Sequence, residues 1–416
     1  MTNRIVKGNR LGIAILAMAL AVLLLFAACA PPSTVEEEKT VEYAGIVPMT
    51  GAAQASLQIQ VQAAQDYIRY FNEQNGIPGV TVKFLWGDTA LQLTRFVSDY
   101  EKFKARGVPI MWIMEGDPML GFADDFAEDQ IPVLGSAIGF ERICYAGGWE
   151  YMQSPTMAEE FAVVAEYVKA SWKEARAPKL AFVGIQSVWG DDPQPEGKKY
   201  AQSLGFEILP SEIVPYVVVD ATINLARLKS EGADFVYMQV LPSSLTPTLR
   251  DAERLGLLGQ MHFIGTETGM GDNVLKMAGA AGEGYLFAMI APWFDETDNP
   301  GIKLMMDKQM EYHGKVVRDN AYRNGWIVGA VACEAIKNAV ENVGYGNVDG
   351  AAIKEALDNM QDFDINGLVT VTYKDRGLDR RGITKLAIYE VRGGKMVPVT
   401  DWRESPSLVP PGLVRK

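Results

Sequence analysis

Few residues in this sequence have the types and spacing that catalysis or metal binding requires. The two histidines, His262 and His313, are in no metal-ligand spacing. The motifs G-x-S-x-G, G-x-x-x-x-G-K-S/T, H-E-x-x-H and C-x-x-C are absent, and the glycines within residues 265–271 do not fit G-x-G-x-x-G. Pairs of a nucleophile and a base are therefore scarce. The sequence predicts a protein that is not an enzyme and that needs neither a metal nor another cofactor.

Acidic side chains follow two of the apolar runs. Glu115 and Asp117 follow one run, and Glu267 follows the run MHFIG at 261–265. A carboxylate at the end of a buried strand is desolvated, and an unpaired charge there is costly. Glu267 therefore needs a hydrogen-bond donor, which is either a ligand or an arginine or backbone amide of the protein. Asp117 followed by Pro118 also suits a helix N-cap and N1 pair, so capping alone is an equal interpretation of Asp117.

The elements that must position these residues begin at residues 43–79. Tyr43 to Val47 is a short apolar run, and residues 48–53 have turn chemistry. Apolar residues then recur at helical spacing, at Leu57, Val61, Ala64, Ile68 and Phe71. Turn residues at 75–79 lead into a second β-rich run, Val80 to Trp86, which predicts a βαβ unit with a parallel sheet. Ligands of such sheets bind beyond the carboxyl ends of the strands, so the loop at 48–53 is a candidate binding loop.

The same alternation continues along the chain. Strands are expected at 109–114 and 131–135 around a helix at 118–128. A second series has expected helices at 157–172, 193–204, 221–229 and 245–255 and strands at 179–185, 233–240 and 261–265. The repetition predicts an α/β fold with two lobes of similar construction, each with a parallel sheet. The loops 186–192, 241–244 and 266–271 should face the first lobe across a cleft.

The remaining elements predict three passages between the lobes, which form a hinge. A strand at 284–292 returns the chain to lobe 1, helices follow at 300–312, 322–343 and 351–360, and strands at 369–373, 384–391 and 396–399 finish lobe 2. We therefore assign 43–152 and 290–366 to lobe 1, 153–289 and 367–402 to lobe 2, and 403–416 to a tail. Three passages resist twisting but permit closure.

The first 28 residues have the pattern of an export signal. Three basic residues precede an apolar run from Leu11 to Phe26, and two alanines and Cys29 follow. The small residues before Cys29 resemble a lipobox, with Phe26 in place of the usual leucine, which implies cleavage before residue 29 and lipidation of Cys29. An uncleaved membrane anchor is the alternative, and both place the body outside the cytoplasm. Residues 29–42 are predicted to be a linker.

The charge and the cysteines exclude further classes. The chain has 39 basic and 52 acidic residues, and the segment 1–28 holds three of the basic and none of the acidic ones, so the remainder has a net charge of −16. This balance disfavours nucleic acid as a partner. Cys144 and Cys333 could form a bridge in an oxidising compartment. Two buried free thiols are the favoured interpretation, because Cys333 lies in a helical run.

The order of these weak signals resembles the branched-chain amino acid (Leu/Ile/Val) type of solute-binding proteins of ABC transporters. The matching features are P-x-T-G after the first strand, the turn N-x-x-x-G-I-x-G at 72–79, and a strand ending in Gly87-Asp88-Thr89, within a likeness that runs from about Tyr43 to Trp402. The resemblance implies the type I periplasmic binding fold in a lipid-anchored, extracytoplasmic monomer. It also implies binding of a small organic solute, such as an amino acid, amide or related carboxylate, and its delivery to ABC permease subunits. A ligand sensor of the same fold is the alternative function.

The resemblance places lobe 1 ligand contacts in three loops. The corresponding residues are Thr50 and Gly51, then Glu115, Gly116 and Asp117, and then Ser136 and Ala137. The family usually has a small hydroxyl residue in the middle loop, where it holds a ligand carboxylate. Glu115 and Asp117 depart from this pattern and argue against a simple α-amino acid held in the usual way.

The resemblance places further contacts in lobe 2. Trp189 stands at an aromatic position that stacks on the ligand, with a surface Trp in a turn as the alternative, and Glu267 stands at the acidic position that pairs with a ligand ammonium group. Leu241 lies near another cleft-lining position. Met157 follows Thr156 where some members have an acidic contact, and this loss again weakens the assignment to amino acids.

The resemblance also bears on three residues outside these contacts. Gln239 and Ser243 lie near the cleft-lining position of Leu241. Trp326 replaces the usual tyrosine at a helix start and is assigned to the core.

Overall fold

The structure is a computed structural model that describes residues 39–51, 54–136, 139–145, 148–268, 270–374, 378–409 and 413. The predicted signal segment, Cys29 and most of the predicted linker lie outside these ranges. Within them, no helix is both long enough and apolar enough to cross a membrane.

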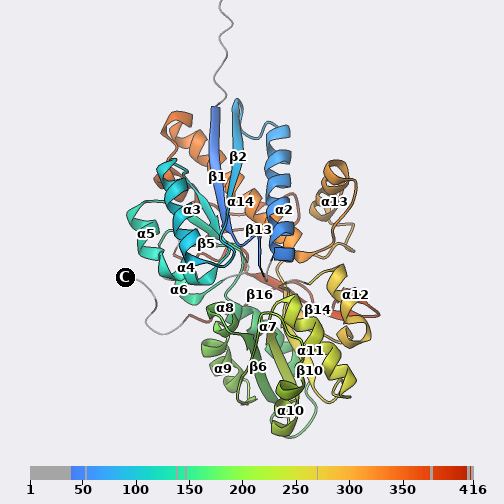
Figure 1. The fold of residues 1–416 in the computed structure, drawn as a ribbon. Helices are drawn as coiled ribbons and strands as arrows, with labels where there is room; N and C mark the ends of the chain where they lie inside the picture. The colour runs from blue at the N-terminus through green and yellow to red at the C-terminus, as the bar shows by residue number, and fades with distance from the viewer. Residues whose placement is uncertain are drawn as a thin grey trace, which may run out of the picture. The chain divides into compact units, whose positions relative to one another are not determined.

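The first sheet is formed by the N-terminal part of the chain. Its strands are β1 (Lys39–Val47), β2 (Val80–Asp88), β3 (Met111–Ile113), β4 (Val133–Gly135) and β5 (Glu150–Met152). Their order in the sheet is β2-β1-β3-β4-β5, and the pairs β1–β3, β3–β4 and β4–β5 are parallel. This sheet and the helices that pack on it (Figure 1) are called lobe 1 below.

Helices connect the strands of lobe 1. They are α2 (Gln54–Glu73), α3 (Leu93–Ala105), α4 (Gly116–Gly121), α5 (Ala123–Glu128) and α6 (Glu141–Tyr145). The apolar residues predicted to share one face of α2 are all buried. The single helix expected at 118–128 is wrong, because Phe122, with φ −106° and ψ 13°, leaves the helical conformation and separates α4 from α5.

The second sheet has the order β15-β14-β11-β10-β9-β6-β7, with β8 paired to β6 and β16 paired to β14. Its strands are β6 (Lys179–Ile185), β7 (Glu207–Ile208), β8 (Glu212–Val214), β9 (Phe235–Gln239), β10 (His262–Thr266), β11 (Leu286–Met289), β14 (Lys385–Arg392), β15 (Lys395–Pro398) and β16 (Arg403–Glu404). The strands from β6 to β11 pair in parallel, and β14 joins β11 antiparallel.

The helices of the second sheet complete lobe 2. They are α7 (Met157–Ser171), α8 (Val188–Asp191), α9 (Gln194–Ser203), α10 (Thr222–Glu231), α11 (Pro242–Arg254) and α12 (Asp272–Ala278), followed by the 3-10 turn η1 (Gly279–Gly282). The α/β fold with two parallel-sheet lobes is therefore confirmed. β16 was assigned to the tail, since a strand of two residues has no periodicity to recognise.

The chain returns to lobe 1 between the two parts of lobe 2. This segment contains α13 (Pro300–His313), α14 (Asn320–Val343), η2 (Tyr345–Asn347) and α15 (Gly350–Asp358), followed by β12 (Phe363–Asp364) and β13 (Thr370–Val371). The strand expected at 369–373 does not join the sheet of lobe 2. Only Thr370 and Val371 are extended, and they pair with β12 in a separate two-stranded sheet.

Helix α14 packs directly on α2, and glycine permits the close approach. A Cβ atom on Gly325 would lie 2.0 Å from the backbone oxygen of Gln60, and one on Gly329 would lie 3.0 Å from the backbone oxygen of Ala64. The first distance is far inside van der Waals contact. The backbones of the two helices can therefore reach this separation only if residue 325 has no side chain.

The chain passes between the lobes three times, and two of these passages are hydrogen-bonded to each other. The backbone N–H of Met152 donates to the carbonyl of Arg380 at 2.9 Å, and the N–H groups of Gly382 and Ile383 donate back to Met152 and Gln153 at 2.8 and 2.9 Å. Pairing of the two segments restricts their relative twist. Closure about the paired segments is the motion that such a hinge leaves free.

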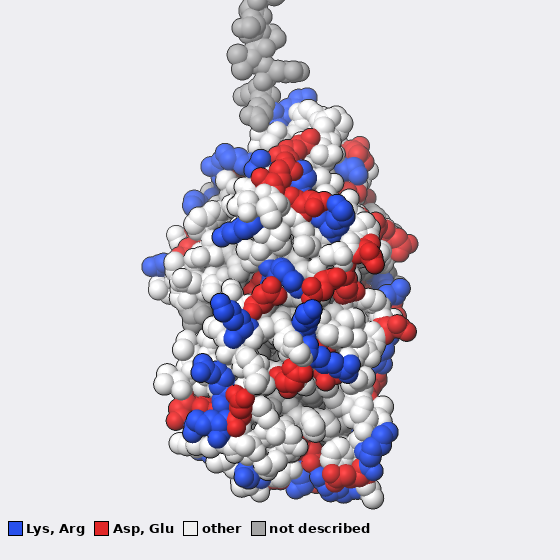
Figure 2. Space-filling view, turned by 90° about the vertical axis from the view of Figure 1, so that its right-hand side faces the viewer, with Lys and Arg blue, Asp and Glu red and all other residues white. Residues whose placement is uncertain are grey.

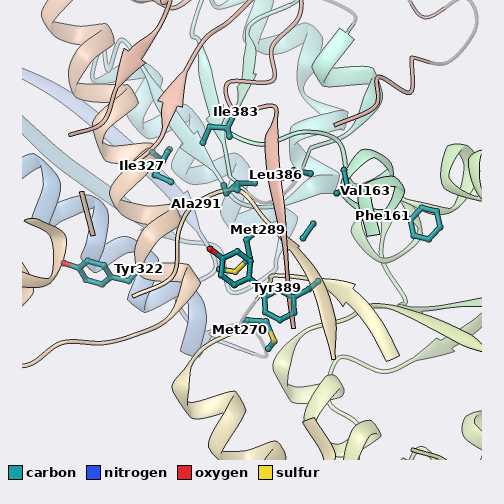
Figure 3. Close-up of a cluster of buried hydrophobic side chains, with 14 of the residues drawn as sticks. Phe161, Val163, Met270, Met289, Ala291, Tyr322, Ile327, Ile383, Leu386 and Tyr389 are labelled. Atoms are coloured by element: carbon teal, nitrogen blue, oxygen red, sulfur yellow. The ribbon is translucent and has the colours of Figure 1, made fainter. Parts of the chain in front are cut away.

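A continuous apolar cluster lies at this junction. Figure 3 shows side chains from α7, β14 and α14 in this cluster, among them Phe161, Leu386 and Ile327. All three are buried. The hinge segments therefore run through a packed core that contains residues of both lobes.

Cys144 and Cys333 are both free and buried, as the favoured interpretation expected. Cys144 lies in α6 and Cys333 lies in α14. Burial raises the pKa of both thiols well above the usual value. The two side chains therefore act as small buried apolar groups.

Candidate functional site

A cavity of about 220 Å³ lies between the two lobes. Lobe 1 contributes residues of α2, the end of β3 and the first turns of α4 and α14, including Leu57, Gln60, Met114, Glu115, Asn320 and Asn324. Lobe 2 contributes residues that follow β6, β8, β9 and β10, including Trp189, Tyr216, Leu241, Ser243 and Thr268. The volume is at or just below the lower end of the usual range for ligand pockets, about 300–1,000 Å³, which suits a small solute.

The position of the cavity follows from the topology of the sheets. The parallel strands of each lobe end on the same side, and the loops and helix N-termini that follow them meet there. This is the edge at which open α/β sheets bind ligands. Short α4 and α8 contact each other across the gap, so residues of both lobes enclose the space.

Five of the predicted site residues line this cavity. They are Glu115, Gly116, Asp117, Trp189 and Leu241. Trp189 is partly buried and packs against both apolar clusters, which favours the interpretation of a cavity-wall residue over that of a surface Trp in a turn. Ser243, which was placed near the cleft, also lines it.

Thr50 and Gly51 are exposed and are not among the lining residues. The hydroxyl of Thr50 donates to Oδ2 of Asp88 at 2.8 Å, and its backbone N–H donates to Oδ1 of Asp88 at 3.2 Å. These bonds hold the loop after β1 to the end of β2. In this arrangement Thr50 fixes the loop beside the cavity, and Pro48 of the same loop reaches the wall.

Ser136 is fully buried behind the cavity wall. Its Oγ accepts hydrogen bonds from Nε2 of Gln60 at 2.6 Å and from Nε1 of Trp112 at 3.1 Å, and it donates to Sδ of Met114 at 2.7 Å. Gln60 and Met114 themselves line the cavity. Ser136 therefore positions two wall residues without reaching the space, and Ala137 lies outside the described residues.

Met157 and Gln239 are buried but do not line the cavity. Met157 is the first residue of α7, where Thr156 and Glu159 form a reciprocal capping box. Gln239 ends β9, and neither polar atom of its side chain has a hydrogen-bond partner. Trp326 is fully buried in α14 against Tyr67 and is part of the core.

Glu115 is a partly buried carboxylate in the cavity wall. Burial raises its pKa, the hydroxyl of Thr89 donates to it and opposes this shift, and the nearby charges of Asp117 and Asp88 raise the pKa further. Among the described residues, the neighbouring charges that shift the pKa of Glu115 are both negative. The capping interpretation of Asp117 finds no support, because α4 begins after residue 115 and its N-cap makes no side-chain hydrogen bond.

Glu267 finds its donors within the protein. Its Oε2 lies 3.1 Å from Nη2 of Arg323 and accepts from the backbone N–H of Ile290 at 3.4 Å, while its Oε1 accepts from Nδ2 of Asn324 at 3.3 Å. The Arg323 side chain is fully buried. The arrangement matches the alternative in which an arginine and a backbone amide satisfy Glu267, and the residue is not among those lining the cavity.

Asn320 and Asn324 line the cavity but were not predicted. They lie one turn apart at the start of α14, and Asp319 caps this helix by accepting from the N–H of Ala321 at 2.9 Å. Both asparagines are at most 2% exposed, and neither Oδ1 atom has a hydrogen-bond donor. Two buried amides spaced by four residues at the start of an apolar helix were the available sequence signal.

The charged residues that line the cavity in the described part of the chain are Glu115 and Asp117. Acidic and basic side chains are interspersed on the face shown in Figure 2. In the ranges that the structure describes, no group of three or more His, Cys, Asp or Glu side chains is placed to hold a metal ion. The chemistry that the cavity offers is hydrogen bonding, apolar contact and the negative charge of Glu115 and Asp117.

Two α/β lobes with a cavity between them define the class of two-lobed binding proteins. Residues 40–395 match the family model described as periplasmic binding protein, and the chain belongs to this family. A comparison with curated proteins found no match.

Solved structures share the fold. A branched-chain amino acid ABC transporter protein from Thermus thermophilus with bound valine has a TM-score of 0.80 and 24% identity, over 88% of this chain and 97% of that chain. A fatty acid ABC transporter substrate-binding protein from Thermomonospora curvata has a TM-score of 0.79 and 17% identity, over 89% and 95%. A solute binding protein from Rhodopseudomonas palustris in complex with 3,4-dihydroxybenzoic acid has a TM-score of 0.74 and 18% identity, over 90% and 99%.

Proposed function

We propose that this protein is the extracytoplasmic solute-binding protein of an ABC importer. It is anchored by a lipid at Cys29, binds one small organic solute between its lobes as a monomer, and delivers the solute to the permease subunits. The observation that carries this proposal is the cavity, whose wall is built from both lobes. A ligand in this position contacts both lobes only when they are closed, so binding energy favours the closed form.

The family and the solved neighbours support the proposal. The matched family is that of periplasmic binding proteins, and the neighbours named above are ABC transporter binding proteins. The three passages of the chain, two of them hydrogen-bonded, suit a hinge that closes without twisting. The protein acts on its solute by binding alone, and no catalytic step is required.

The proposal predicts that a small solute stabilises the protein and closes it. Residues 40–416 would be screened by thermal unfolding against amino acids, amides, amines, aromatic acids and dicarboxylates. A solute at about 100 times its Kd should add about 2.7 kcal/mol to the free energy of unfolding. Small-angle scattering with that solute should then show a smaller radius of gyration than for the free protein. A library without any stabilising compound, or a saturated protein with an unchanged scattering profile, would contradict the proposal.

Trp189 is predicted to contribute to binding through its ring. It lines the cavity, and an aromatic side chain gives a large contact area at little entropic cost. Trp189→Ala should weaken binding of the best solute from the screen by about 1–3 kcal/mol in calorimetry. Trp86→Ala is the matched control, because Trp86 is 47% exposed on β2 and does not line the cavity. Equal affinities of the two variants would show that the ring of Trp189 does not contact the solute.

A further inference from the structure

We propose that the solute is an organic cation, a primary amine or other ammonium compound with an apolar body and no carboxylate. This inference rests on the proposed function, because it takes the inter-lobe cavity to be the solute site. It follows from the charges of the cavity wall, which includes two carboxylates and, among its described residues, no basic side chain.

The strongest acceptors in the wall are two carboxylates. Glu115 is the N-cap of α4 and Asp117 lies in its first turn. Both residues line the cavity. Thr89 donates to one oxygen of Glu115, and a carboxylate has room for about three further donors. An ammonium group supplies three N–H donors and the opposite charge.

The asparagines of α14 supply further acceptors on the lobe 1 side. Nδ2 of Asn324 donates to Glu267, which fixes the orientation of the amide. Its Oδ1 is therefore an acceptor, and it has no donor in the protein. Oδ1 of Asn320 is likewise without a donor. A buried acceptor without a partner is costly. Both Oδ1 atoms are closed to solvent, so they add partial negative charge behind the wall, which favours a cation in the cavity.

Basic residues are missing from the same wall. Among the described residues that line the cavity, none is Lys, Arg or His. A ligand carboxylate would thus enter a cavity that holds two carboxylates and no formal positive charge, and like charges at close range repel.

The partial positive charges of helix N-termini near the cavity do not outweigh the negative charge of its wall. The N-terminus of a helix is equivalent to roughly half an elementary charge, and for α14 it is already capped by the side chain of Asp319. Helices α2 and α11 also start at the wall. Each of them favours an anion with about half a charge, whereas the partly buried Glu115 and the exposed Asp117 both oppose one.

The rest of the wall suits an apolar body. Lobe 2 contributes Ile185, Val188, Trp189, Tyr216 and Leu241, and lobe 1 contributes Leu57. Trp189 and Tyr216 also have ring faces, which attract cations. The predicted solute therefore has one charged head and an aliphatic or aromatic body, and the cavity of about 220 Å³ limits its size.

The test compares compounds that differ only in their charged groups. Isobutylamine, isoamylamine and phenethylamine have the skeletons of valine, leucine and phenylalanine without the carboxylate, and isovalerate, isocaproate and hydrocinnamate have the same skeletons without the amine. Thermal shift and calorimetry on residues 40–416 would rank the three groups. At least one amine should bind about tenfold or more tightly than the matching amino acid and acid.

Two variants locate the binding in the cavity. Glu115→Gln keeps an acceptor for Thr89 and removes the charge, and it should weaken binding of the best amine by about 10- to 100-fold. Glu128→Gln is the control, since Glu128 is an exposed carboxylate of α5 outside the wall. Equal affinities of the two variants would overturn the assignment of Glu115.

The affinity for the amine should also depend on pH. Burial and the charges of Asp117 and Asp88 raise the pKa of Glu115, and alkyl amines stay charged far above neutrality, as lysine does at about pH 10. Binding should therefore weaken in the wild type as the pH falls through the raised pKa of Glu115, and weaken much less in Glu115→Gln. The same pH dependence in both proteins would contradict the role of this carboxylate.

The outcomes separate this inference from the proposed function. If an amino acid or acid binds more tightly than every amine, the proposal of a cationic solute is overturned. The solute-binding function is then still supported. If no compound of this series or of the wider library binds, the result contradicts both the solute-binding function and the proposal that the solute is an organic cation.

Discussion

Replacement of Arg323 by methionine is expected to lower the free energy of unfolding by about 3–5 kcal/mol. The substitution leaves the carboxylate of Glu267 buried without its charged partner, and an uncompensated buried charge has a cost of this size. Arg323 also donates to the carbonyl oxygens of Ala291 and Pro292, and both would lose a donor. Urea unfolding followed by circular dichroism would measure the loss.

The same change at an exposed ion pair gives the control. Arg69 and Glu73 form a pair in which the two side chains are 55% and 36% exposed. Arg69→Met should cost much less than Arg323→Met, because exposed ion pairs contribute little to stability. Similar losses in the two variants would mean that the Arg323–Glu267 pair is no more important than a surface contact.

A double variant separates the effect of the unpaired carboxylate from the effect of the lost Arg323 side chain. If the loss in Arg323→Met comes from the unpaired carboxylate, then Arg323→Met combined with Glu267→Met should be more stable than Arg323→Met alone. Burial and the charge of Glu267 also raise the pKa of Glu160. Removal of Glu267 therefore relieves a second unfavourable interaction, which adds to the recovery.

Glu267 illustrates which features of the site could be predicted from the sequence and which could not. The end of a buried strand at residue 265 predicted that a carboxylate there would need a donor. The sequence could not identify the donor, because Arg323 is 56 residues away and belongs to the other lobe. The acidic position of the family suggested a ligand, whereas the structure places the side chain between the lobes, where it orients Asn324.

Other differences have local causes. The helix α3 was not predicted, although Phe96, Tyr100 and Phe103 form its buried face, because no Gly or Pro marks its start. The order of strands and loops predicted that residues 186–192 and 241–244 face the cleft, because parallel sheets set that order. The family resemblance then selected Trp189, Leu241 and Glu115. Thr50 follows β1 as expected, but its hydroxyl is engaged by Asp88, a contact that depends on the end of a neighbouring strand.

Replacement of Gly325 by alanine is expected to lower the free energy of unfolding by about 3 kcal/mol. The new Cβ would lie 2.0 Å from the backbone oxygen of Gln60 and 2.8 Å from Cβ of Ala63. Overpacking of this kind costs about 1–3 kcal/mol, and a clash with backbone cannot be relieved by a rotamer change. We therefore expect the upper end of this range in chemical unfolding.

Gly121→Ala is the matched control for this substitution. Gly121 is the last residue of α4, and no atom lies within 4 Å of the position of its Cβ. Alanine should be neutral there, or stabilising by up to about 1 kcal/mol, since it favours the helix over glycine. A loss at Gly121 as large as that at Gly325 would show that helix contact is not the cause.

The Gly325 variant should also weaken solute binding, because the two helices that it separates form one side of the cavity. Gln60 belongs to α2, and Asn320 and Asn324 belong to α14, and all three line the space. If α14 moves away from α2, the acceptor groups of Asn320 and Asn324 move relative to the carboxylate of Glu115. Binding of the best solute should then fall more in Gly325→Ala than in Gly121→Ala, measured by calorimetry at a temperature where both variants are folded. Unchanged affinity together with lost stability would mean that the start of α14 keeps its place while the remainder of the helix shifts.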